Sequence, residues 1–203
     1  MKAGVLHAKD DLRYEDIPTP VPEKGEVLVR VKATGICGSD IPRVLGDGAH
    51  FYPIVLGHEF SGEVAQIGEG VTSVKVGDRV AGVPLVPCMK CDDCQKGNYS
   101  LCKHYSFIGS RENGSFAEYV KMPEKNVVKF DDSVSFEQGA FFEPSTVALH
   151  GISHAQYRGG EDVAILGGGT IGLFTAQWAK IFGAKRVFVF DIDDDRLKLA
   201  EEL

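Results

Sequence analysis

The sequence predicts a β-rich domain followed by the first part of a doubly wound α/β domain. Residues 1–130 contain short segments of alternating apolar and polar residues, separated by glycine-containing turns. Around residues 138–156 a longer apolar stretch predicts a helix that links the domains. From residue 162 a strand, a glycine turn, a helix and a strand follow. We therefore expect one domain over residues 1–155 and the start of another over residues 156–203.

The β-rich part is clearest at residues 26–32, Glu-Val-Leu-Val-Arg-Val-Lys, which alternate with the period of a half-buried strand. The α/β part has a buried strand at 163–166, a helix at 170–182 closed by Gly183, a strand at 186–190 and the start of another helix. This is a single βαβ unit. A doubly wound sheet needs several more strands, so we expect the second domain to be incomplete.

Composition narrows the function classes. The chain of 203 residues has 43% hydrophobic residues and a formal net charge of -7, as in ordinary globular proteins. The negative charge disfavours nucleic acid and anionic membranes as partners, including the alternative of a zinc-dependent nucleic-acid module. No apolar run is long enough to span a bilayer, and the N-terminus lacks the core of a signal peptide. These features predict a cytoplasmic protein.

Four of the five cysteines follow the spacing Cys88-x2-Cys91-x2-Cys94-x7-Cys102. Four thiolates this close suit one zinc ion, and a complete shell of four soft ligands indicates a structural site. Positive residues near them in sequence are expected to offset the thiolate charge: Lys90, Lys96, Lys103 and His104. An iron–sulfur cluster is the main alternative, but its usual motif has three residues before the last cysteine, followed by proline. Disulfides or inert thiols are the remaining alternative.

A second candidate site combines Cys37, in a glycine-containing loop, with His58, which is twenty-one residues later. Taken alone, these residues are better explained by a buried cysteine and a core histidine. His150 and His154 have the i, i+4 spacing of a helix face, but no carboxylate completes a known motif, so we expect them not to bind metal.

The segment Gly167-Gly-Gly-Thr-Ile-Gly172 satisfies G-x-G-x-x-G between a predicted strand and helix, nineteen residues before Asp191. This context predicts a dinucleotide site at Gly167, Gly169, Thr170, Ile171 and Gly172. Asp191 would bind the ribose hydroxyls and repel a 2′-phosphate, which favours NAD over NADP. Arg196 is a candidate contact for the adenine region, although a solvated helix arginine is an equal alternative.

Residues 57–62, Gly-His-Glu-Phe-Ser-Gly, with Gly68 and Val71, resemble the signature of zinc-containing medium-chain dehydrogenases, and the cysteine spacing resembles their structural zinc loop. The resemblance covers essentially the whole chain. It implies a β-rich GroES-like barrel as catalytic domain, followed by the first βαβ unit of an incomplete Rossmann domain. It also implies two Zn²⁺ per chain and NAD as cofactor.

At the positions that match the family's motifs, the resemblance implies that Cys37, His58 and Glu143 are the ligands of a catalytic zinc. Without it, Glu143 would be a solvated carboxylate at a helix start. Glu59 would be an exchangeable ligand or a neighbour of the shell, and Ser39 the hydroxyl that takes the substrate proton. Pro42 stands where many relatives have a relay histidine, which leaves water or His50 as substitutes.

Glutamate at the third ligand position makes the chain most similar to the polyol dehydrogenases, and residues 48–59 and 107–114 resemble those that act on phosphorylated polyols. Ser115 stands where many relatives have a glycine, and we expect this difference to affect only the geometry of the local turn. Arg43 and Arg111 are candidates for the phosphate, with surface arginines as the alternative. Free polyols such as sorbitol, or butanediol, are the second choice of substrate. We expect a homo-oligomer, dimer or tetramer, for the full-length enzyme, and the chain alone to be an inactive zinc-stabilised fragment.

Overall fold

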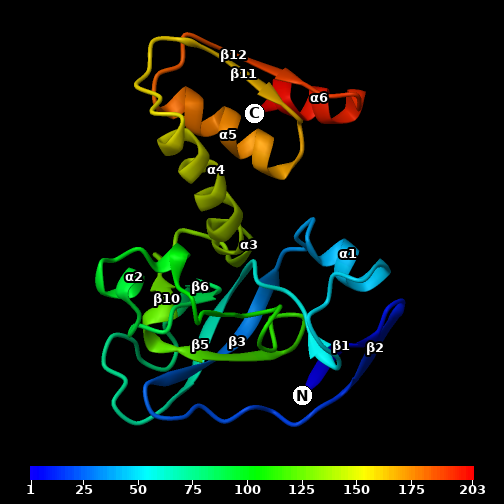
Figure 1. Cartoon of the computed structure of the whole chain (residues 1–203), viewed down its shortest axis with the longest axis vertical. Helices are drawn as coiled ribbons and strands as arrows, with labels where there is room; N and C mark the ends of the chain where they lie inside the picture. Colours follow the sequence, from blue (N-terminus) through cyan, green and yellow to red (C-terminus); the bar gives the residue numbers. More distant parts are fainter. The chain divides into compact units, whose positions relative to one another are not determined.

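The computed structural model describes all 203 residues, which form two compact units, Met1–Phe141 and Phe142–Leu203 (Figure 1). The division assigns residues 142–154 to the second unit. The domain boundary that the sequence predicts after residue 155 stays a prediction.

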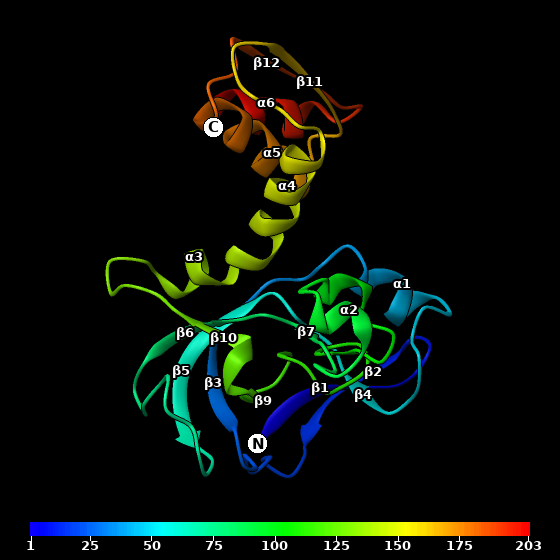
Figure 2. The same cartoon turned by 60° about the vertical axis from the view of Figure 1, so that its left-hand side comes forward.

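A five-stranded antiparallel sheet forms the centre of the first unit, and its long strands curve in Figure 2. Its order is β10-β6-β5-β3-β9. The strands are β3 (Glu26–Thr34), β5 (Phe60–Ile67), β6 (Arg79–Gly82), β9 (Tyr119–Pro123) and β10 (Val127–Lys129). The strand predicted at residues 26–32 lies within β3 and is confirmed.

The core of this unit lies against the five-stranded sheet. Val27 and Val29, two apart on β3, point to the same face because side chains alternate along a strand. They are fully buried and pack in one cluster with Phe60, Val64, Val74, Val80, Ile108, Val120 and Met122. The apolar positions of these strands therefore build the main core of the unit, which fixes the strands that carry the candidate site, and two smaller clusters lie around β1 and residues 54–56.

Smaller elements surround this sheet. A three-stranded sheet has the order β2-β1-β4, from β1 (Lys2–Ala8), β2 (Asp11–Asp16) and β4 (Ile54–Val55), and a two-stranded sheet pairs β7 (Leu85–Val86) with β8 (Ser106–Phe107). The helical segments are short: α1 (Asp40–Leu45), α2 (Asp92–Gln95), η1 (Tyr99–Leu101), η2 (Glu124–Asn126) and α3 (Phe136–Ala140).

The single helix predicted over residues 138–156 is divided into α3 and α4 (Phe142–His154). Ser135 and Gln138 form a capping box that starts α3 two residues earlier than expected. Pro144 explains the division, because it has no N–H to donate to the carbonyl of Ala140 and its ring would clash there in a continuous helix. In the first turn of a new helix the missing N–H costs little.

The second unit contains the predicted βαβ arrangement. Strands β11 (Asp162–Leu166) and β12 (Arg186–Phe190) pair in parallel, joined by α5 (Thr170–Ile181), and α6 (Asp194–Glu202) follows. Gly183, at φ 83°, ends α5, and the N–H of Ala184 donates to the carbonyl of Ala179 as in a Schellman motif. Trp178 of α5 donates from Nε1 to Ser145 Oγ of α4 at 3.0 Å.

None of the helices has both the length and the apolar character that a transmembrane span requires.

Candidate metal centres and dinucleotide turn

The four predicted cysteine ligands converge in one lobe, called here the four-cysteine lobe. Their sulfurs lie within 4.8 Å of one another, with the Cys88–Cys94 and Cys91–Cys102 sulfurs 4.0 Å apart. In a tetrahedral zinc site with bonds of about 2.3 Å, the sulfurs are roughly 3.8 Å apart. The geometry of the lobe therefore fits one zinc ion and leaves no fifth protein ligand in the cluster.

Backbone N–H groups provide the positive ends of dipoles around these sulfurs. The N–H groups of Cys94 and Lys103 lower the pKa of Cys91 to about 6, whereas burial raises the pKa of Cys94 to about 12. A cation is needed to hold all four as thiolates, which supports metal binding. From the sequence, charge compensation is expected from the side chains of Lys90, Lys96, Lys103 and His104. These residues are exposed, and Lys90 and Lys103 act through their backbone N–H groups.

The second cluster, called here the Cys37 cluster, contains Cys37, His58 and Glu59, whose ligand atoms also lie within 4.8 Å of one another. It joins segments that are distant in sequence through the pairing of β3 with β5, in which Thr34 is opposite Phe60. The N–H of Gly35 continues the ladder by donating to the carbonyl of Glu59 at 2.7 Å. The loop after β3 therefore carries Cys37 to the residues that directly precede β5.

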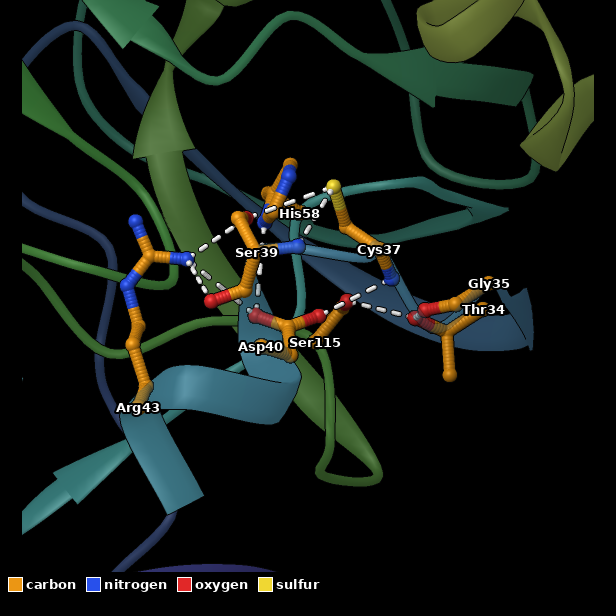
Figure 3. A network of polar contacts seen from close by, with 8 residues as sticks. All are labelled: Thr34, Gly35, Cys37, Ser39, Asp40, Arg43, His58 and Ser115. Atoms are coloured by element: carbon orange, nitrogen blue, oxygen red, sulfur yellow. Dashed lines mark hydrogen bonds and ion pairs between the residues drawn. The ribbon is translucent and has the colours of Figure 1, made fainter. Parts of the chain in front are cut away.

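Asp40 supports this cluster and is not among the residues predicted from the sequence. It is buried, with 2% exposure. Its Oδ2 accepts the N–H of Cys37 at 3.0 Å, and its Oδ1 lies 3.9 Å from His58 Nδ1 and 3.5 Å from Arg43 Nη1 (Figure 3). Burial raises the pKa of Asp40, against the opposing effects of His58, the Cys37 N–H and Arg43. An acidic residue three positions after a candidate ligand is the sequence signal that could have found it.

His58 Nδ1 and Asp40 Oδ1 are both buried without a hydrogen-bond partner. Such unpaired buried atoms are costly in an ordinary core, and metal-ligating histidines commonly direct their second nitrogen at a carboxylate. This arrangement and the thiolate, imidazole and carboxylate donors fit a zinc ion better than the alternative of an inert core cysteine and histidine.

Ser39 lies beside the thiol of Cys37, at the N-terminal end of α1. Its Oγ donates to Cys37 Sγ at 3.3 Å and accepts from Arg43 Nη1 at 2.7 Å. Pro42 lies within α1, and His50 is exposed. The hydroxyl expected to receive the substrate proton is thus already in contact with an arginine.

The position of His58 depends on a close crossing of backbones. Gly57 has φ 90°, and a Cβ on Gly109 or Gly114 would lie 2.3 Å or 2.1 Å from the Gly57 carbonyl oxygen. Phe107 contacts the His58 ring edge-on, with the ring centroids 5.5 Å apart. The two segments singled out in the sequence, residues 48–59 and 107–114, therefore pack directly together at the candidate site.

Ser115 does more than shape a local turn, contrary to expectation. The residue is buried, with 1% exposure, and its Oγ lies 2.7 Å from Thr34 Oγ1. This hydrogen bond ties the segment after Gly114 to the end of β3, three residues before Cys37. A glycine here would lack the contact.

Further expectations from the sequence concern Arg111, Glu143 and the histidines at 150 and 154. Arg111 is exposed and lies over the Tyr105 ring, 4.8 Å from its centroid. Glu143 lies in the first turn of α4, in the second unit, and its role as a ligand stays a prediction. The exposed rings of His150 and His154 contact each other edge-on at 4.2 Å.

The glycine turn joins β11 to α5 as the motif predicts. Gly167 has φ 107°, and a Cβ on Gly172 would lie 1.8 Å from the Gly167 carbonyl oxygen, so both positions require glycine. Gly169 is the N-cap residue of α5, followed by exposed Thr170 and Ile171. The N–H of Gly168 donates to Asp191 Oδ2 at 2.6 Å, and Arg196 Nη1 lies 3.5 Å from the same oxygen. The turn thus brings together the residues expected for a dinucleotide.

Comparison with known proteins agrees with this geometry. The chain is 47% identical over 187 residues to galactitol 1-phosphate 5-dehydrogenase of Escherichia coli (strain K12), covering 92% of this chain and 54% of that protein. It is 38% identical over 208 residues to sorbitol dehydrogenase of Bacillus subtilis (strain 168), covering 100% and 59%. The chain therefore spans little more than half the length of these relatives.

The crystal structure of galactitol-1-phosphate dehydrogenase from Escherichia coli superimposes with a TM-score of 0.95 at 45% identity, covering 100% of this chain and 59% of that one. The family described as the alcohol dehydrogenase GroES-like domain matches residues 23–132, which is more than half of the 203 residues. This confirms the resemblance on which the sequence analysis relied. The chain belongs to the alcohol dehydrogenase family with a GroES-like domain, and its similarity extends to the polyol dehydrogenases.

Proposed function

We propose that this chain is the N-terminal part of a zinc- and NAD-dependent dehydrogenase that oxidises a secondary hydroxyl of a polyol or polyol phosphate to a ketone. The observation that carries the proposal is the Cys37 cluster with the Ser39 hydroxyl beside it. Zinc bound there would supply Lewis acidity toward the substrate hydroxyl, and NAD would supply the hydride acceptor.

Two metal clusters of different composition support this division of roles. The four-cysteine lobe has a complete set of soft ligands, which suits a structural ion. Cys37 and His58, with Glu143 from α4 as the proposed third ligand, would leave a position for substrate. Glu59 lies close enough to act as an exchangeable ligand. Asp40 would orient His58 through its Nδ1, and Ser39 would contact the reacting hydroxyl.

For the cofactor, we propose that Gly167, Gly169, Thr170, Ile171 and Gly172 hold the pyrophosphate at the start of α5. Asp191 would accept the ribose hydroxyls, because each carboxylate oxygen can accept a further hydrogen bond beside its N–H donors. Arg196, next to Asp191, would face the adenine side. In this proposal β11, α5, β12 and α6 are the first part of a Rossmann domain.

For the substrate, we propose a phosphorylated polyol similar to galactitol 1-phosphate, because of the similarity to galactitol 1-phosphate 5-dehydrogenase. Arg111 is the first candidate for the phosphate, since its guanidinium is exposed and lies on the Tyr105 ring. Arg43 is the second candidate. Free polyols are the alternative, supported by the similarity to sorbitol dehydrogenase. We expect the full-length enzyme to be a homo-oligomer.

The test of substrate class compares kcat/KM for paired free and phosphorylated polyols, using a protein that carries this chain and a complete nucleotide domain. We expect a preference for the phosphorylated substrate that Arg111→Ala reduces, with exposed Arg13→Ala as the control. Equal rates on both substrates would exclude a phosphate contact while leaving the dehydrogenase proposal in place.

A separate test uses the 203-residue chain. We expect it to bind zinc but to catalyse no turnover, because it spans little more than half of its relatives. Metal analysis giving less than one zinc per chain would exclude the four-cysteine site. NAD-dependent oxidation of a polyol by the chain alone would show that it is not an inactive fragment.

A further inference from the structure

We propose that Arg43 is a positioning residue that sets the direction of the Ser39 hydroxyl, so that Ser39 acts as a hydrogen-bond donor at the Cys37 cluster and passes no proton along α1. This inference rests on the proposed function of that cluster. Figure 3 shows the guanidinium of Arg43 reaching back from α1 to Ser39.

Arg43 and Ser39 are in direct contact. Arg43 Nη1 donates to Ser39 Oγ at 2.7 Å and to the Ser39 carbonyl oxygen at 3.0 Å. Two acceptors on one residue fix the guanidinium and the Ser39 side chain together. Residues four apart meet on one side of a helix, so the short α1 suffices to bring the two side chains into contact.

This contact restricts the direction of the Ser39 hydroxyl hydrogen. A serine hydroxyl has one hydrogen and two acceptor lone pairs, and a guanidinium can only donate. Because Arg43 occupies a lone pair of Ser39, the hydroxyl hydrogen must point elsewhere. In the structure Ser39 Oγ donates to Cys37 Sγ, with the oxygen and the sulfur 3.3 Å apart.

The surroundings of Arg43 hold its guanidinium in place. Its side chain is only 17% exposed, and its Nε is buried without a hydrogen-bond partner. The carboxylate of Asp40 lies 3.5 Å from Nη1 and balances the positive charge. The guanidinium is therefore built into the cluster and is not a loosely placed surface cation. Since a guanidinium only donates hydrogen bonds, Arg43 offers Ser39 no acceptor for its hydroxyl hydrogen.

The experiment measures the thiolate-to-cobalt charge-transfer band of the chain loaded with Co²⁺. Cys37→Ser removes the thiolate of this cluster and leaves the four-cysteine lobe, so the difference spectrum isolates the band that depends on Cys37. A hydrogen bond to a thiolate stabilises its lone pair, and losing that bond shifts the band to lower energy. We expect Ser39→Ala and Arg43→Ala to shift the band in this same direction.

The decisive comparison is a double-mutant cycle. We expect Arg43→Ala to shift the band in the original protein and to have no effect in a Ser39→Ala background. Arg43→Lys keeps one donor for Ser39 and should restore part of the original position. Arg43→Met keeps the length of the side chain without a donor and should behave like Arg43→Ala, which gives a second variant if the alanine variant fails to fold. Arg13→Ala is the control at an exposed arginine.

Two results would overturn the inference alone. An unshifted band in both Arg43→Ala and Arg43→Met would show that Arg43 does not orient Ser39. An equal shift with and without Ser39 would assign the effect to Asp40 or to the fold of α1. Absence of any band that depends on Cys37 would instead overturn the proposed metal site, and the inference with it.

Discussion

The four-cysteine lobe and the Cys37 cluster are both candidate zinc sites of one unit, yet they are assembled over very different sequence distances. The lobe takes all its ligands from fifteen consecutive residues, whereas the cluster joins Cys37 to His58 and Glu59 through the pairing of β3 with β5. The four-cysteine lobe depends mainly on the spacing of its ligands along the sequence. An assembled site depends on strand register, on a backbone crossing and on the residues that orient its ligands.

The largest expected effect is on the lobe. Cys91→Ser removes one of its four ligands, and we expect stability to fall by a sizeable part of the roughly 10 to 16 kcal/mol that structural zinc supplies to small zinc domains. Urea unfolding together with zinc analysis measures this. Cys37→Ser is the matched variant in the other cluster and should lose zinc with a much smaller loss of stability. Similar losses in both variants would contradict the proposed division into structural and catalytic sites.

The next prediction concerns the backbone crossing beneath His58. In Gly114→Ala the new Cβ would lie 2.1 Å from the Gly57 carbonyl oxygen, which forces the two segments apart. We expect a loss of about 3 kcal/mol in the free energy of unfolding, the upper part of the usual range for overpacking. Gly38→Ala has nothing within 4 Å of the new Cβ and should change stability little. Equal melting temperatures for the two variants would show that the crossing is not rigid.

A smaller effect is expected at Asp40. Asp40→Asn keeps an oxygen for the Cys37 N–H but removes the charge facing His58. Loss of such a supporting group typically lowers metal affinity by about 10- to 100-fold. Chelator competition should show weaker binding at the Cys37 cluster and unchanged binding at the lobe. Asp47→Asn, at an exposed position of the same segment, is the control. Unaltered affinity in Asp40→Asn would mean that His58 is oriented without it.

The smallest effect is a pH dependence at the glycine turn, another site assembled from neighbouring segments. The N–H groups of Gly168 and Asp193 hold the pKa of Asp191 below its usual value. The stabilisation is therefore fully present above the unfolded pKa of about 3.9 and is lost as pH falls through the lower folded pKa. NMR titration of the Asp191 carboxyl should show the low midpoint. A midpoint at or above about 3.9 would contradict the hydrogen bonds to this carboxylate.

Features that depend on neighbouring residues could be predicted from the sequence, whereas features that depend on contacts between distant segments could not. The cysteine spacing, the strand at 26–32 and the βαβ unit depend on short-range patterns, and the structure has all three. The division of the helix at Pro144 was missed because apolar periodicity continues across it. Asp40, the Arg43–Ser39 contact and the Ser115–Thr34 hydrogen bond depend on where separate segments meet. No local sequence pattern predicts these contacts between segments. The glycines at 57, 109 and 114 do indicate one such contact, the backbone crossing beneath His58.

The crossing at Gly57 also limits how the substrate range could be altered by laboratory evolution. Gly109 and Gly114 have to stay glycine, Ser110 is 4% exposed, and Asn113 Oδ1 accepts the N–H of Val55. Within residues 109–114, this leaves Arg111 and Glu112 as the exposed residues whose side chains do not bind the backbone as Asn113 does. A library randomised at these two positions alone would vary the charge of this segment while leaving the backbone crossing beneath His58 intact.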